Sequence, residues 1–253
     1  GKVLSTSQKS ILANDQTSFC YNFDVIFSLG NKSMEKAKKF NSNIKNIVPI
    51  GSLFKSKDFI NNSSNDKKST PLKSFDILFL GGNIMFADFF ENHEDFKKNY
   101  YDSLRWLLKI QDYFPNYSIG IKHHKNAIQD IYEKKIFEGT NVEIINDKCN
   151  SYKLISNSKI CITYASTIGY EALQMGKPCI FLDPNYTNYF LPNKGENQIT
   201  DISRAENSNE FIKILEKMIK GNINIEDYKD SIKEVICDIN DPHKIMYNYY
   251  KSK

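Results

Sequence analysis

From residue 75 onward, short apolar runs alternate with helical stretches, and this alternation restricts the fold more than any other feature. The apolar runs cover 75–80, 117–121, 142–145, 159–165 and 177–183. After the first run comes EDFKKNYYDSLRWLLKIQDYF, in which apolar residues recur every three or four positions, as on one face of a helix. Strands that alternate with helices indicate a parallel sheet covered on both faces. The sequence therefore predicts an α/β, Rossmann-like, doubly wound sheet that binds ligands at the carboxyl ends of its strands.

The two ends of the chain follow other patterns. Apolar runs at 24–30 and 47–51 flank a lysine-rich helical stretch, which predicts a small β-α-β piece. The polar segment 55–74 has the composition of a linker. We therefore expect residues 1–54 to be the remnant or end of an N-terminal α/β domain, 55–74 to be a linker, and 75–253 to be the Rossmann-like domain. At the other end, two helices at 207–220 and 226–236 precede a tail that starts at Pro242.

Composition excludes several classes of partner. The net charge is +4, but 32 of the 34 basic residues are lysines, and nucleic-acid surfaces combine arginine with exposed aromatics. We expect no nucleic-acid partner. No apolar run approaches the roughly 18 residues that a membrane-spanning helix needs, so we expect no membrane-spanning helix. The five cysteines are odd in number and lack zinc-ligand spacing, which favours free thiols, no metal and a reducing cytoplasm.

The segment ITYASTIGYEALQMGKPCIFLD (162–183) is the most informative for chemistry. Ser166 and Thr167 lie in the turn between a buried strand and a helix, where free amides and hydroxyl groups suit a phosphate or diphosphate. Gly169 would let the backbone approach a ligand closely, and Glu171 would accept hydrogen bonds from ribose hydroxyls. In the alternative interpretation, Ser166 is only an N-cap and Glu171 only a favourable first-turn charge.

Three further strand ends carry polar or small residues. In IGIKHHKN, His123 and His124 follow a strand and could bind or protonate a phosphate, although a plain polar loop is the alternative. In FLGGNIMF, Gly81 and Gly82 suit a tight turn near a ligand, with Asn83 behind them. This is neither a dinucleotide fingerprint nor a P-loop, so nicotinamide enzymes and P-loop NTPases are not expected. Asp183 is either a ligand contact or a turn cap.

STIGYEALQMGKPCI resembles the donor-binding segment of GT-B glycosyltransferases and the related nucleotide-sugar 2-epimerases. IKHHK is similar to the histidine motif of bacterial capsule, Kdo and teichoic acid transferases, with Lys125 where that motif has proline. The resemblance extends in order over roughly 24–192, with the first two runs matching the end of an N-terminal half. It implies a donor phosphate bound by His124, Ser166 and Thr167, and a donor ribose bound by Glu171.

The resemblance implies a cytoplasmic, metal-independent glycosyltransferase of surface-polysaccharide synthesis, with His124 as its catalytic residue and 75–253 as its nucleotide-sugar-binding domain. It implies no cofactor. The expected donor is a CMP, CDP or UDP sugar, with CMP or CDP favoured, and the expected acceptor is a glycan. The resemblance also allows peripheral contact with the inner face of the membrane. His123, Gly81, Gly82, Asn83, Gly169 and Asp183 complete the expected donor site. Two alternatives remain: a nucleotide-sugar 2-epimerase, and a non-catalytic nucleotide-binding or interaction module.

Overall fold

The computed structural model describes residues 5–7, 22–32, 43–53, 73–81, 93–123, 131–145, 149–186, 191–239 and 241–252. Its main sheet has six parallel strands in the order β6-β5-β4-β7-β8-β9. The strands are β4 (Phe75–Leu80), β5 (Ile119–Lys122), β6 (Val142–Ile145), β7 (Ser158–Tyr164), β8 (Cys179–Leu182) and β9 (Arg204–Ala205). Numbered along the chain, this order is 3-2-1-4-5-6, which is that of doubly wound nucleotide-binding sheets. The expected α/β Rossmann-like class is confirmed.

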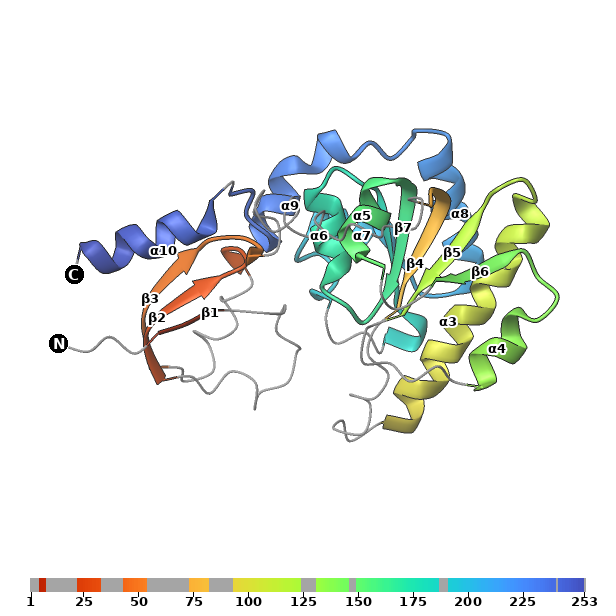
Figure 1. Cartoon of the computed structure of the whole chain (residues 1–253), viewed down its shortest axis with the longest axis horizontal. Helices are drawn as coiled ribbons and strands as arrows, with labels where there is room; N and C mark the ends of the chain where they lie inside the picture. The colour runs from red at the N-terminus through yellow and green to blue at the C-terminus, as the bar shows by residue number, and fades with distance from the viewer. Residues whose placement is uncertain are drawn as a thin grey trace.

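Helices cover both faces of the main sheet (Figure 1). One face carries α3 (His93–Tyr113), α4 (Ile131–Phe137) and α8 (Ser208–Ile219). The other carries α5 (Ser151–Ser156), α6 (Ile168–Gln174), α7 (Gln198–Ser203) and α9 (Lys229–Val235). Two short 3-10 helices, η6 (Pro184–Tyr186) and η7 (Ile225–Tyr228), lie in the connections.

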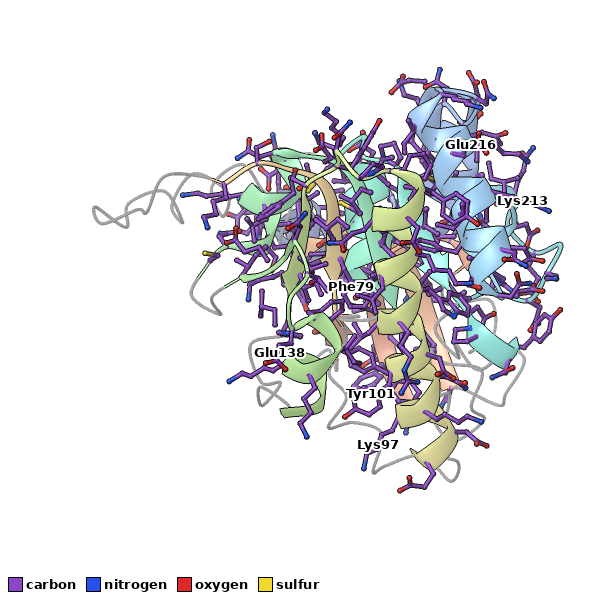
Figure 2. All side chains as sticks on the ribbon, turned by 90° about the vertical axis from the view of Figure 1, so that its right-hand side faces the viewer. Phe79, Lys97, Tyr101, Glu138, Lys213 and Glu216 are labelled. Atoms are coloured by element: carbon purple, nitrogen blue, oxygen red, sulfur yellow. The ribbon has the colours of Figure 1, made fainter. Side chains whose placement is uncertain are left out.

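Alternation along each strand divides the core between the two layers. Ile77 and Phe79 of β4 point to the α3 layer, whereas Leu78 and Leu80 point to the α6 layer. Figure 2 shows Phe79 beneath α3, where its ring centroid lies 6.4 Å from that of Tyr100. Both layers are therefore apolar cores, as the continuous apolar runs predict for a parallel sheet.

All five predicted strands of this sheet are present, and two of them, β4 and β6, have the predicted bounds. The sixth strand, β9, was not predicted, because two residues with an arginine form no apolar run. After β5, the described residues resume at Ile131, where α4 begins. None of the helices in the described ranges combines the length and apolar character needed to cross a membrane.

A second, smaller sheet is formed near the N-terminus by three parallel strands, β1 (Ser5–Ser7), β2 (Asn22–Ser28) and β3 (Asn43–Pro49). We call it the N-terminal sheet. The lysine-rich helical stretch and most of the expected linker lie outside the described residues. The expected domain limits therefore remain a prediction.

The chain returns to the N-terminal sheet at its other end. Residues from Pro242 form a helix, α10 (Pro242–Lys251), where the sequence pattern indicated only a tail. Ile245, Met246 and Tyr249 of α10 pack on a small core around Val25 and Phe27 of β2. Figure 1 shows α10 lying along this sheet, so residues from both ends of the chain share one layer.

Candidate functional site

The candidate site lies at the carboxyl edge of the main sheet, the edge at which its parallel strands end. Leu80 of β4 is in register with Lys122 of β5 on one side and with Thr163 of β7 on the other. The residues that follow these strands are therefore neighbours. β4 and β7 are also the pair at which the strand order reverses, and such a switch point opens a crevice where ligands bind in this class of fold.

Gly81 lies at the centre of this edge. Its amide donates to the carbonyl of Lys122 at 2.9 Å. A Cβ placed on Gly81 would lie 3.3 Å from the Tyr100 hydroxyl and 3.5 Å from Nδ1 of His123. Gly81 and His123 are thus neighbours, and a side chain on Gly81 would have to displace the Tyr100 hydroxyl slightly.

His123 and Lys122 are both almost fully buried where β5 ends. The Lys122 ammonium donates to the carbonyl of His123 at 3.0 Å. The imidazole of His123 thus lies next to Gly81, and the Lys122 ammonium is bonded to the backbone at the same strand end. The phosphate-binding role of His123 remains a prediction.

Ser166 and Thr167 form the turn between β7 and α6, as expected, and both are half-buried. Thr167 occupies the N-cap position of α6 but makes no capping hydrogen bond with its side chain in the described part of the chain. Among the described residues, the Ser166 hydroxyl accepts a single long hydrogen bond, 3.5 Å, from the amide of Ile168. The simple capping interpretation therefore explains little of this turn.

Glu171 is half-buried in α6 and bonded through both carboxylate oxygens. Oε1 accepts a hydrogen bond from the hydroxyl of Ser52, and Oε2 accepts one from the hydroxyl of Tyr152 at 2.9 Å. Burial raises the pKa of Glu171 above its ordinary value, and the two hydroxyl donors offset only part of that effect. The sequence pattern indicated neither partner, because both are distant along the chain.

Close packing requires a glycine at position 169, whatever its predicted role in bringing the backbone close to a ligand. A Cβ there would lie 2.6 Å from both Cε1 of Phe181 and Cγ2 of Thr163. The glycine therefore allows α6 to lie close to β7 and β8, which keeps Ser166 and Thr167 at the carboxyl edge.

Asp183 is buried at the end of β8, and its Oδ2 lies 3.7 Å from Nη1 of Arg204. The Arg204 guanidinium also donates to the carbonyl of Pro192. Asp183 is thus partly neutralised inside the protein, and its direct contact with a ligand remains a prediction. Arg204 was not singled out from the sequence, because β9 has no recognisable pattern.

Backbone strain gathers at the same edge. Among the described residues, the only non-glycine residues with positive φ are Ala165 at 47°, Asn185 at 57° and Tyr186 at 57°. Ala165 directly follows β7, and the other two follow β8. Strained backbone of this kind clusters at ligand and active sites, because the surrounding structure must hold it in place.

Three of the predicted site residues, Gly82, Asn83 and His124, lie outside the described residues. Within the described ranges, no three His, Cys, Asp or Glu side chains gather in a way that could hold a metal ion.

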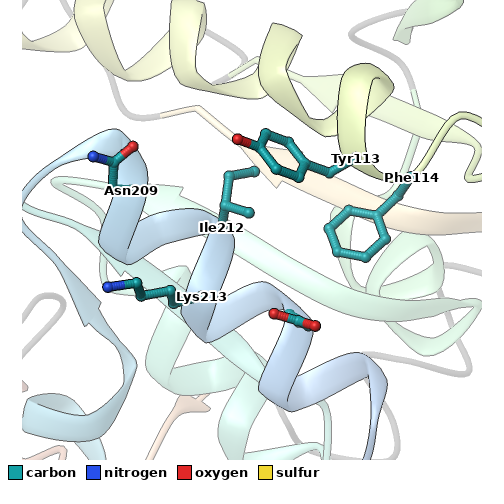
Figure 3. Close-up of a pocket in the computed structure, with 6 residues that line it drawn as sticks. Tyr113, Phe114, Asn209, Ile212 and Lys213 are labelled. Atoms are coloured by element: carbon teal, nitrogen blue, oxygen red, sulfur yellow. The ribbon is translucent and has the colours of Figure 1, made fainter.

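A groove between α3 and α8 lies elsewhere (Figure 3). Tyr113 and Phe114, at the end of α3, face Ile212 of α8 across it. Phe114 precedes the start of β5 by five residues, so this groove belongs to the amino edge of the sheet. It is separate from the candidate site.

No family model matches the chain, and no curated protein sequence matches it. Solved structures do match. A UDP complex of Staphylococcus aureus MnaA superposes with a TM-score of 0.59 at 12% identity, covering 91% of this chain and 59% of that one. The UDP-GlcNAc 2-epimerase of Neisseria meningitidis bound to UDP-GlcNAc gives 0.56 at 16% identity, covering 91% and 62%.

The wall teichoic acid polymerase TagF gives a TM-score of 0.53 at 15% identity, covering 95% of this chain and 60% of that one. The chain thus spans about three fifths of the length of these three proteins. At such low identity, the likeness concerns the fold alone. The chain has a Rossmann-like fold of the GT-B type.

Proposed function

We propose that this chain binds a nucleotide sugar at the carboxyl edge of its main sheet and takes part in transferring the sugar to a polysaccharide acceptor. The observation that carries the proposal is the convergence of Gly81, His123 and the Ser166–Thr167 turn at the switch point between β4 and β7. In open α/β sheets this is where phosphate-bearing ligands bind. The fold likeness to structures solved with UDP and UDP-GlcNAc supports the same class of ligand.

The chemistry follows from the charge that develops on the departing nucleotide. When the bond between sugar and phosphate breaks, negative charge grows on the phosphate oxygens. Hydroxyl donors at Ser166 and Thr167, with a histidine from the end of β5, would stabilise that charge in a partly covered site. The resemblance assigns the catalytic part to His124, and Glu171 would hold the ribose. The acceptor would be a bacterial surface glycan.

A thermal-shift panel tests the ligand class. A nucleotide at about 100 times its dissociation constant should stabilise the chain by roughly 2.7 kcal/mol. We expect one of UDP, CDP or CMP to do so, and GDP and NAD not to. The variant Ser166→Ala/Thr167→Ala should lose the effect, whereas Ser156→Ala/Ser252→Ala, which removes two exposed hydroxyls, should keep it. If none of UDP, CDP and CMP stabilises the wild type, the proposal is wrong.

A nucleotide-sugar 2-epimerase is the second candidate, favoured by the likeness to the Neisseria meningitidis enzyme. The two reactions differ in their products. An epimerase converts UDP-GlcNAc to its C2 epimer without an acceptor, whereas a transferase releases a free nucleotide when a glycan acceptor is supplied. Proton NMR of the protein incubated with UDP-GlcNAc, with and without a surface glycan, separates them.

A further inference from the structure

The carboxylate of Glu171 is held by hydroxyl groups from two distant parts of the chain. Ser52 lies just after β3 of the N-terminal sheet, and Tyr152 lies in the first turn of α5. Each donates to a different oxygen of Glu171. Figure 1 shows α5 and α6 on the side of the main sheet that faces the N-terminal sheet. The carboxylate therefore lies where the two sheets meet.

The two hydroxyl donors fix the orientation of the Glu171 carboxylate without occupying all of its acceptor sites. An ionised carboxylate offers about four lone-pair sites on its two oxygens. Ser52 and Tyr152 use one on each oxygen, so among the described residues one site on each remains for a ligand. Because both oxygens are held, the carboxylate plane cannot rotate freely about the last side-chain bond. A pair of adjacent hydroxyl groups, such as the 2′,3′-diol of a ribose, can use both remaining sites at once.

Ser52 is placed by close packing and not by a flexible loop. It is buried, with only 2% of its surface exposed. Gly51 before it has φ of +73°, and a Cβ there would collide with the carbonyl of Cys237. The side-chain amide of Gln174, one turn along α6 from Glu171, donates to that same carbonyl. Ser52 is thus held in place by packing against α6 and the segment that follows α9.

We propose that Ser52 and Tyr152 are positioning residues that orient Glu171 for the ribose diol, so that both sheets build the ribose subsite. The inference rests on the proposed function. It implies that removing either hydroxyl weakens the recognition of the ribose specifically. A merely structural role would lower the stability of the fold and leave the preference for ribose over its deoxy form unchanged.

The test is a ratio of two dissociation constants measured by calorimetry. The dissociation constant of the 2′,3′-dideoxy analogue is divided by that of the natural nucleotide. The nucleotide used is the one of UDP, CDP and CMP that binds most tightly. In the wild type we expect a ratio of about tenfold or more, because hydrogen bonds to a charged group contribute that much. Glu171→Gln should bring the ratio close to one. Tyr152→Phe and Ser52→Ala should each lower it at least threefold.

Matched variants control for folding. Ser158→Ala removes a serine hydroxyl that is as buried as that of Ser52 but bonded to a backbone carbonyl at the amino edge. Tyr113→Phe removes an exposed tyrosine hydroxyl. Both should keep the wild-type ratio. If Glu171→Gln lowers the ratio and Tyr152→Phe and Ser52→Ala do not, the positioning role is wrong and the proposed function stands. If the wild type binds no nucleotide, both are wrong.

Discussion

Arg204 and Asp183 form a buried ion pair beside the candidate site, with Nη1 of the arginine 3.7 Å from Oδ2 of the aspartate. Both side chains are about 95% covered. The same guanidinium donates to the carbonyl of Pro192, while its Nε has no hydrogen-bond partner in the described part of the chain. Arg204 thus binds both the start of the connection that follows β8, at Asp183, and a point midway along it, at Pro192.

Replacing Arg204 should destabilise the fold strongly. Arg204→Met leaves Asp183 as an uncompensated buried charge, which costs about 3–5 kcal/mol in comparable pairs. Urea denaturation at neutral pH measures the loss. The double variant Arg204→Met/Asp183→Asn should recover more than half of it, because the stranded charge is gone.

The chain's other arginine, Arg105, provides the control. It lies in an exposed i,i+3 pair with Asp102 on α3. Arg105→Met should change the unfolding free energy by about 0–1 kcal/mol, as for other surface pairs. Equal losses for Arg204→Met and Arg105→Met would show that burial of the Asp183 pair has no energetic importance.

Gly169→Ala should loosen the contact between α6 and the sheet. The added methyl would lie 2.6 Å from Phe181 and Thr163 side-chain atoms, too close for any unshifted packing. Overpacking of this kind costs about 1–3 kcal/mol. Chemical denaturation should show the loss, and Gly169→Ala/Phe181→Leu should recover part of it. A neutral Gly169→Ala would mean that α6 has room to move outward.

The first five strands of the main sheet could be predicted because each is a short run dominated by apolar residues. Phe75–Leu80 and Val142–Ile145 are bounded by polar residues or glycine and match the predicted limits. β9 could not be found in the same way, since its pairing with Phe181 and Leu182 depends on the sheet already present. The packing of α10 could not be predicted from the sequence either, because its partner Phe27 is more than 200 residues away along the chain.

The candidate site could be predicted where a polar or small residue directly follows a strand. Gly81, His123 and the Ser166–Thr167 turn have this signature, and the parallel topology brings them together. Ser52 and Tyr152 do not have it. Their relation to Glu171 arises from packing between distant segments, and a single sequence carries no signal of such pairings.

Glu171 should make the stability fall as pH rises. Burial raises the pKa of Glu171 above its ordinary value of 4.5, so the folded state holds the proton more tightly than the unfolded state. The stabilisation is fully present below the unfolded pKa and is lost as pH rises through the folded pKa. Relative to Glu171→Gln, the wild type should therefore lose stability with rising pH above about 4.5. Denaturation of both proteins at a series of pH values measures the difference, and a constant or rising difference would contradict the assignment.

Tyr249 should stabilise the N-terminal sheet locally. Its ring packs edge-on against Phe27, with centroids 5.6 Å apart. Tyr249→Ala removes this contact and part of the apolar cover of β2, which should cost about 1–3 kcal/mol. Hydrogen exchange followed by mass spectrometry should show faster exchange in β2, β3 and α10 and unchanged exchange in β4 and β7. Tyr247→Ala, on the same helix but 57% exposed, should leave every segment unchanged. Faster exchange throughout the main sheet in Tyr249→Ala would show instead that both sheets unfold as one unit.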